Sequence, residues 1–103
     1  MLSSAHLAEP ASRIPEGLTC YKRTPVFTQA SVPAGLLRAH STKEGVWGRI
    51  RVLEGALLYR ILDARRCPRE LVLTPAAFGV VEPTILHEVE PAGPVRFQLE
   101  FFR

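Results

Sequence analysis

Residues 46–62, VWGRIRVLEGALLYRIL, decide the fold class of this chain. Strand-forming residues fill both halves of the stretch, and Glu54-Gly55 separates them. An acidic residue and glycine between two apolar runs are typical of a β-hairpin turn. The second half, 56–62, would also place four Leu and Ile side chains on one face of a short helix. The turn signal and the surrounding Pro and Gly favour two strands, 46–53 and 56–62.

The rest of the chain extends this pattern in both directions. Nine Pro and seven Gly are spread along the chain, and they exclude long helices because Pro ends helices and Gly weakens them. The clearest alternation of apolar and polar residues lies in the last segment, 95–102. The remaining predicted strands are 21–28, 35–40, 70–74, 79–82 and 86–90. About eight short strands without a crossover helix predict an all-β antiparallel sandwich or barrel.

Length and composition predict one folded domain. The chain has 103 residues, of which 47% are hydrophobic and 22% charged, which is typical of a globular protein. No apolar run approaches the roughly 20 residues of a membrane-spanning helix, and residues 1–10 lack the features of a secretory signal. We therefore expect a cytoplasmic protein without a membrane partner. Residues 1–16, with an exposed His6, are expected to form a poorly ordered leader or extended arm, and 17–103 the domain.

The charge and the cysteines favour no nucleic-acid or thiol chemistry. The formal net charge is +3, and eleven of the 13 cationic residues are Arg. The only local basic cluster is 65–69, without aromatic residues between the arginines, so we expect no nucleic-acid binding. Cys20 and Cys67 lie 47 positions apart with no metal-binding spacing, which favours two structural thiols.

Two histidines are the candidates for chemistry. His40 and His87 each lie near the end of a predicted strand, beside a turn. Imidazole is the commonest transition-metal ligand, although each histidine taken alone is more typical of a core or surface residue. Glu82 precedes a turn and is expected to aim inward as a third ligand, whereas Glu100 is expected to be an exposed, paired charge. Motifs of phosphate-binding loops, serine hydrolases and zinc proteases do not occur.

These residues carry a resemblance to a family. The segments 20–62, 80–91 (VVEPTILHEVEP) and 95–103 (VRFQLEFFR) resemble the small cupins of the TehB/YeaR type, and the likeness covers about residues 16–103. The resemblance implies a cupin fold, which is a double-stranded β-helix or jelly-roll barrel, and it places the chain near tellurite-resistance and stress-response proteins. In longer members a methyltransferase domain follows, and we expect no such domain in these 103 residues.

The resemblance also implies a divalent metal, Zn or Fe. His40 matches the first histidine of the first cupin motif and His87 the histidine of the second, while Thr42 stands where a second histidine is usual. Two usual ligands are therefore missing, so the site must recruit Glu82 or Glu100, keep open water positions or bind the metal weakly. Of these, Glu82 is the expected third metal ligand beside His40 and His87. The side chains expected to line the pocket are Arg38, Trp47, Arg49, Tyr59 and Glu100.

Three hypotheses about function follow from the sequence. The first, which we favour, is a metal-dependent cupin that acts on or sequesters a small molecule or oxyanion. The second is a non-catalytic module that binds or senses a small anion near Arg38 or Arg49. The third is an interaction subunit whose strand edges form a homodimer. The sequence does not decide whether the chain is an enzyme.

Overall fold

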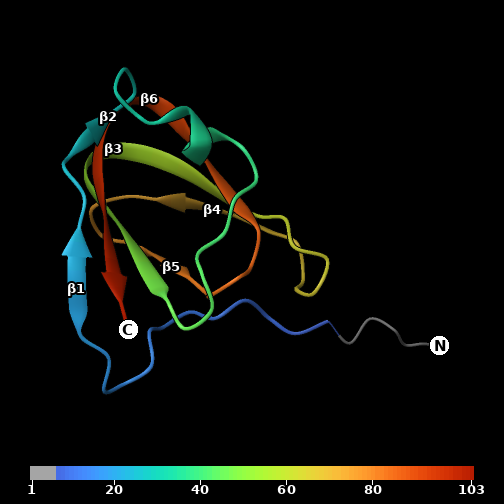
Figure 1. Ribbon diagram of the computed structural model, residues 1–103. Helices are drawn as coiled ribbons and strands as arrows, with labels where there is room; N and C mark the ends of the chain where they lie inside the picture. Colours follow the sequence, from blue (N-terminus) through green and yellow to red (C-terminus); the bar gives the residue numbers. More distant parts are fainter. Residues whose placement is uncertain (1–6) are drawn as a thin grey trace.

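Six antiparallel strands and one short 3-10 helix make up the part of the chain that the structure, a computed structural model, describes, residues 7–103 (Figure 1). The elements are β1 (Cys20–Arg23), β2 (Phe27–Thr28), η1 (Ala34–Leu37), β3 (Trp47–Ile61), β4 (Arg69–Leu73), β5 (Gly79–Val81) and β6 (His87–Phe102). The strand order is β1-β6-β3-β4, with β2 beside β6 and β5 beside β3. The all-β prediction is confirmed. The sheet is open, so the jelly-roll barrel is not confirmed.

The predicted hairpin at Glu54-Gly55 is wrong, because β3 runs through it as one strand. The register against β6 shifts between Val52 and Glu54 and again between Gly55 and Leu57, which marks β-bulges. Gly55 has a φ of 78°, and a Cβ there would meet the Pro94 carbonyl oxygen at 2.1 Å. Glycine is required at this position for a bulge and a close backbone approach, and not for a chain reversal.

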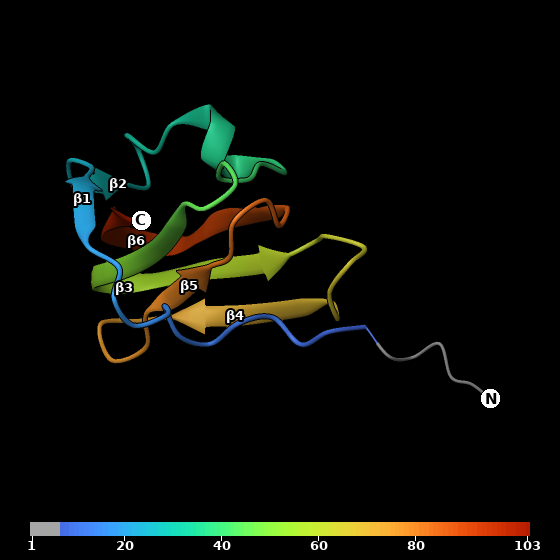
Figure 2. The ribbon, with the colours of Figure 1, turned by 60° about the horizontal axis from the view of Figure 1, so that its bottom comes forward.

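The two long strands, β3 and β6, curve, and each pairs with more than one neighbouring strand. The first half of β3 pairs with β5, its second half pairs with β4, and β6 follows it along nearly the whole length. β6 also continues through Pro-Ala-Gly-Pro at 91–94, where the sequence predicts a strand end. Figure 2 shows β4 and β5 lying against the same strand β3 at different angles. This curvature turns one face of the sheet into a concave surface.

The predicted strand at 35–40 is also wrong, because residues Ala34–Leu37 form the helix η1. Pro33 precedes this helix, its ring fixes φ near the helical value, and its carbonyl accepts a hydrogen bond of 3.0 Å from the Leu36 amide. Leu36 packs against the core, and the chain then returns to the sheet at His40. The helix thus covers the open side of the concave face (Figure 2).

The core lies inside the concave face and is made of β-branched, aromatic and leucine side chains. Its buried members are Ile50, Val52, Leu57, Tyr59, Ile61, Leu73, Val81, Ile85, Val89, Val95 and Phe97. Phe97 packs edge-to-face on Phe27 with ring centroids 5.7 Å apart. The Tyr59 hydroxyl donates a hydrogen bond of 2.8 Å to the Val80 carbonyl, so this buried polar group is satisfied. Burial raises the pKa of Tyr59 well above its usual value.

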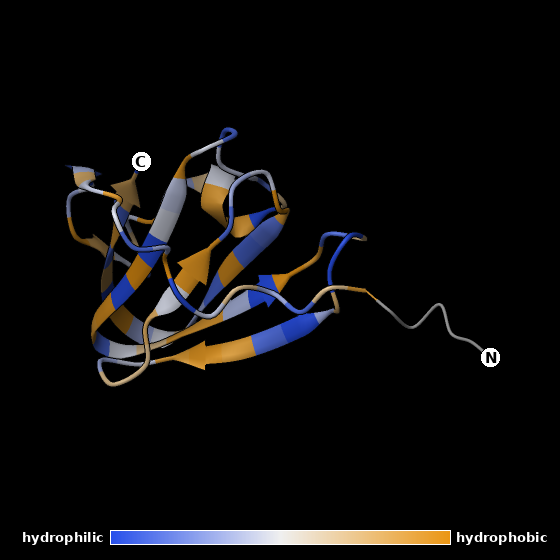
Figure 3. Ribbon diagram, turned by 90° about the horizontal axis from the view of Figure 1, so that it is seen from below, coloured by the Kyte–Doolittle hydropathy of each residue, from blue (hydrophilic) through white to orange (hydrophobic). Residues whose placement is uncertain are grey.

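Residues 7–16 run as an extended arm past β4 and β5. Pro10 is buried, Ala8 bridges Arg66 in parallel, and the Ala11 amide donates a hydrogen bond of 2.9 Å to Glu82. Figure 3 views the molecule from the side on which this arm lies. Residues 1–6 of the predicted leader, His6 among them, lie outside the described residues. The domain boundary after residue 16 stays a prediction.

Candidate functional site

The sheet topology places two histidines directly opposite each other. His40 and His87 form an antiparallel bridge in which each amide donates to the other's carbonyl, at 3.0 and 2.9 Å. Their rings lie side by side with centroids 4.1 Å apart. The chain reaches this arrangement because the segment after η1 returns to the sheet and pairs with the first residue of β6. The structure therefore brings together the two histidines that the sequence singles out.

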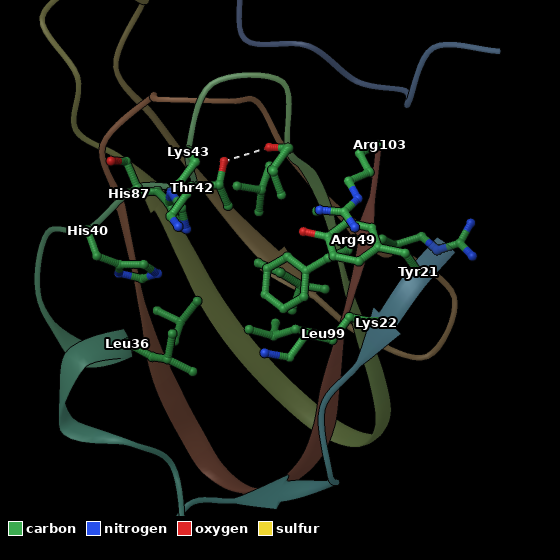
Figure 4. A pocket seen from close by; sticks show the side chains of 17 residues that line it. Tyr21, Lys22, Leu36, His40, Thr42, Lys43, Arg49, His87, Leu99 and Arg103 are labelled. Carbon is green, nitrogen blue, oxygen red and sulfur yellow. Dashed lines mark hydrogen bonds between the residues drawn. The ribbon is translucent and has the colours of Figure 1, made fainter. Parts of the chain in front are cut away.

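Both rings line a cavity of about 420 Å³ in the concave face of the sheet. Its walls come from β1, the loop 41–46, the first part of β3, and both ends of β6 (Figure 4). The lining residues are Tyr21, Lys22, Leu36, His40, Ser41, Thr42, Lys43, Val46, Gly48, Arg49, Ile50, Val81, His87, Val89, Leu99, Phe101 and Arg103. This volume falls in the range of small-molecule sites, which is about 300–1,000 Å³.

The cavity is cationic. The side chains of Lys22, Lys43 and Arg103 line it, and no Asp or Glu side chain does among the residues described. Arg49 borders the cavity, but its guanidinium lies against Glu100, Phe78 and Phe102, which do not line it. Lys22 and Lys43 are the two lysines of the sequence. Neither lysine nor Arg103 takes part in an ion pair within residues 7–103. Because no described Asp or Glu side chain pairs with these three groups, their charges favour an anion in the cavity.

Arg49 is held differently, by a carboxylate below the cavity wall. Glu100 is 1% exposed and accepts hydrogen bonds from Arg49 at 2.7 Å and from Arg23 at 2.6 Å. Burial alone would raise the pKa of Glu100, but hydrogen bonds from the two guanidinium groups outweigh it and lower the pKa. The three residues are cross-strand neighbours, since Glu100 on β6 pairs with Arg49 on β3 and with Arg23 on β1. Glu100 therefore orients Arg49 and is paired as expected, but it is buried and not exposed.

The two histidine rings share one tautomer. The Nδ1 atom of His40 lies 2.9 Å from the Arg38 carbonyl oxygen, and that of His87 lies 3.0 Å from the Ile85 carbonyl oxygen. A carbonyl oxygen only accepts, so Nδ1 carries the proton in each ring and Nε2 remains as an acceptor when the ring is neutral. Burial lowers the pKa of His87 to about 4, and the neighbouring His40 adds to the effect. His87 is thus neutral at pH 7.

Glu82 does not join the histidines. It is absent from the cavity lining, and its carboxylate accepts hydrogen bonds of 3.1 and 2.7 Å from Arg66. Hydrogen bonds from Arg66 and from the Ala11 amide lower the pKa of Glu82. Residues 7–103 contain no group of three or more His, Cys, Asp or Glu side chains placed to hold a metal ion.

The predicted pocket residues divide into two groups. Arg49 lines the cavity, and Glu100 lies behind it. Arg38, Trp47 and Tyr59 do not line it: Arg38 contributes its carbonyl to His40, Trp47 pairs with Phe102 at the start of β3, and Tyr59 lies in the core.

Sequence reasoning missed Lys22, Lys43 and Arg103. Each of them is expected to be a solvated surface charge when its flanking residues alone are considered. One signal in the sequence points to the lysines. All other cationic residues are arginines, and Lys22 and Lys43 lie before and after His40. Nothing in the sequence indicates that Arg103 lies over the ring of Tyr21 at the cavity.

The fold and the site define a small all-β domain with an open antiparallel sheet and a cation-lined cavity. The TehB-like domain family matches residues 22–99. The chain belongs to the family of TehB-like domains, which confirms that part of the resemblance.

Two curated relatives come from Haemophilus influenzae, and each is called "Probable S-adenosyl-L-methionine-dependent methyltransferase TehB". The relative from strain KW20 is 37% identical over 75 residues, which are 71% of this chain and 26% of that protein. The relative from strain 10810 is 36% identical over the same shares. The chain thus spans about a quarter of the length of the curated relatives that it matches.

Two crystal structures are similar to this fold. That of TehB from Haemophilus influenzae has a TM-score of 0.76 and 33% sequence identity, and the match covers 84% of this chain and 32% of that chain. That of a protein from Escherichia coli strain K12 has a TM-score of 0.78 and 26% identity, and the match covers 88% of this chain and 95% of that chain. The second match shows that the same architecture makes up nearly all of another protein chain.

These comparisons correct the predicted function. The expectation of a metal-binding cupin with Zn or Fe is wrong, because the relatives are named as S-adenosylmethionine-dependent methyltransferases and the donor set for a metal is missing from residues 7–103. The structural reason is the pairing of Glu82 with Arg66, which leaves His40 and His87 without a carboxylate beside them. Two histidines alone do not make a transition-metal site of the expected kind.

The cavity does not fit S-adenosylmethionine either. That cofactor carries a sulfonium and an ammonium group beside one carboxylate, and this cavity presents the cationic side chains of Lys22, Lys43 and Arg103 and no Asp or Glu side chain among the residues described. Like charges at close range are unfavourable, most of all where water is scarce.

No helix within residues 7–103 has the length and apolar character to cross a membrane.

Proposed function

We propose that this chain is an anion-binding domain that holds a small anionic molecule for a methyltransferase-related function. The observation that carries the proposal is the charge of the cavity: the side chains of Lys22, Lys43 and Arg103 line it, and no described Asp or Glu side chain does. The names of the relatives support the link to methyl transfer. In this proposal the chain binds the anion, and a separate methyltransferase unit binds S-adenosylmethionine.

The energetics favour an anion of modest size. Hydrogen bonds between a charged donor and an anion contribute about 1.5–3 kcal/mol each, which is about 10- to 100-fold in affinity. Lys22, Lys43 and Arg103 can each donate such a bond without breaking an ion pair with another described residue.

Calorimetric titration with anions tests the proposal. Sodium tellurite, phosphate and hexanoate are titrated into the wild-type chain at low ionic strength, and we expect at least one of them to bind. The double variant Lys22→Glu/Lys43→Glu removes both lysines from the cavity and should weaken that binding at least tenfold.

A matched variant controls for the change in net charge. The double variant Arg69→Glu/Arg96→Glu makes the same change in net charge at exposed sites whose ion-pair partners are Glu9 and Glu54, away from the cavity lining, and should leave the dissociation constant within about twofold. Equal weakening in both variants, or no binding of any anion, would contradict the proposal. A titration with S-adenosylmethionine should give no binding to this chain. A saturable binding signal would contradict the proposal that a separate methyltransferase unit binds this cofactor. The homodimer stays a prediction.

A further inference from the structure

The neutral histidine in the cavity leaves one hydrogen-bonding group without a partner. His87 is 4% exposed, and the only hydrogen bond of its ring to a described group is made by Nδ1 with the Ile85 carbonyl. Its Nε2 is therefore a buried acceptor without a described donor. Buried acceptors in proteins nearly always have a donor, from the protein, from water or from a ligand. His40 repeats the same geometry beside it, with Nδ1 on the Arg38 carbonyl.

The cavity has a different character on its other side. Figure 4 shows His40, His87, Thr42 and Lys43 on one side, and Tyr21, Lys22 and Arg103 on the other. The guanidinium of Arg103 lies 3.9 Å from the centre of the Tyr21 ring, which fixes the position of this cation. The first side thus offers the histidine acceptors beside one lysine, and the opposite side offers charged donors without a histidine.

Between these two sides the cavity is apolar. The side chains that form this part are Leu36, Ile50, Val81, Val89, Leu99 and Phe101. The volume of about 420 Å³ corresponds to roughly a dozen water molecules at the volume each occupies in the liquid. An inorganic oxyanion would fill a small part of this space and would leave the apolar surface in contact with water.

We infer that the ligand of this cavity is an organic anion with a hydroxyl or another hydrogen-bond donor at the end opposite to its acidic group. The acidic group lies against Lys22 and Arg103, the carbon skeleton covers the apolar side chains, and the donor end bonds to Nε2 of His87 or His40. This inference rests on the proposed anion-binding function and adds the chemical class of the anion.

The test uses two matched series of probes. Unbranched carboxylates of four to eight carbons and the corresponding acids with a terminal hydroxyl are titrated into the wild-type chain, together with sodium tellurite. We expect the hydroxylated acid of the best-fitting length to bind about three- to tenfold more tightly than the acid without the hydroxyl. This is the gain in affinity that one hydrogen bond between neutral groups gives. Tellurite should bind at least tenfold more weakly than this acid.

Two variants identify the acceptor. His87→Phe keeps a buried ring and removes the acceptor, so the plain acid should bind as before while the preference for the hydroxylated acid disappears. His40→Phe makes the same change at a half-buried position. It replaces His87→Phe in the test if circular dichroism shows that His87→Phe does not fold. Loss of the preference in at least one of these variants supports the inference.

The failures of the two proposals are distinguishable. If plain and hydroxylated acids bind equally at every length, the inference is overturned and the anion-binding function stands. Tellurite binding as tightly as the best organic acid would also overturn the inference alone. If no anion of either series binds, the proposed function fails and the inference falls with it.

Discussion

The two faces of the sheet use the same cationic residues in opposite ways. On the outer face, Arg60 of β3 donates to Glu70, Glu88 and Glu90 at 2.6, 3.0 and 2.6 Å. In the cavity on the inner face, no described Asp or Glu side chain lines the wall, and Lys22 makes no ion pair with residues 7–103. A cation surrounded by carboxylates ties strands together, whereas one without them remains available for an anion.

Strand parity separates the two faces. Along β6, His87 and Val89 point into the concave side, and Glu88 and Glu90 alternate with them and point outward to β3 and β4. Glu100 is the exception that links the faces, because it is buried yet pairs with Arg49, which lines the cavity. The comparison therefore predicts that a buried carboxylate beside the cavity matters for folding and that the outer carboxylates matter little.

The largest effect should come from Glu100→Gln. This change removes a carboxylate that is 1% exposed and leaves Arg49 without its partner, so the free energy of unfolding should fall by about 3 kcal/mol. Urea unfolding followed by circular dichroism measures it. A loss below about 1 kcal/mol would contradict the structural role of this buried ion pair.

The next effect should be a pH dependence that His87 causes. Burial lowers its pKa in the folded chain to about 4 from 6.5, so the unfolded chain binds one more proton between these values. Stability should be full above pH 6.5 and fall by about 1.4 kcal/mol per pH unit below it, or about 2 kcal/mol at pH 5. The slope ends near pH 4, where the folded chain also binds the proton.

The control for this pH dependence is His87→Phe, in which the free energy of unfolding should be nearly flat between pH 6.5 and pH 5. The lowered pKa values of Glu82 and Glu100 affect stability only below about pH 4.5, so they do not disturb this window. An unchanged slope in the variant would assign the effect to another group.

The smallest effect should come from the outer face. Glu90→Gln removes one of three partners of Arg60 at a side chain that is 55% exposed. Exposed ion pairs contribute little and are screened by salt, so the melting temperature should stay within about 3 °C of the wild type. A shift as large as that of Glu100→Gln would remove the distinction between the two faces.

The all-β class could be predicted from the sequence because Pro, Gly and alternation are local signals. The hairpin at Glu54-Gly55 could not be told from a bulge, since both use a glycine at positive φ, and the choice depends on the approach of Pro94 from a strand about 40 residues later. The same limit applies at 91–94, where β6 continues through residues that usually end strands.

The candidate site could be predicted only where rare residues mark it. His40 and His87 stand out because the chain has three histidines, and the structure places both in one cavity. Glu82 and Glu100 could not be assigned, because their partners Arg66 and Arg49 come from other strands or loops and the pairing is visible only in the fold. Arg103 and Lys22 look like surface charges until β1 pairs with β6.

Chemical-shift mapping tests the central claim most directly. In a titration of the 15N-labelled chain with 6-hydroxyhexanoate, the cavity account predicts that the amide shifts change at 40–43, 48–50 and 101–103 and stay within error around Arg60 and Glu90. Changes centred on the outer face, or none at a ligand concentration that saturates the wild-type chain in calorimetry, would contradict it.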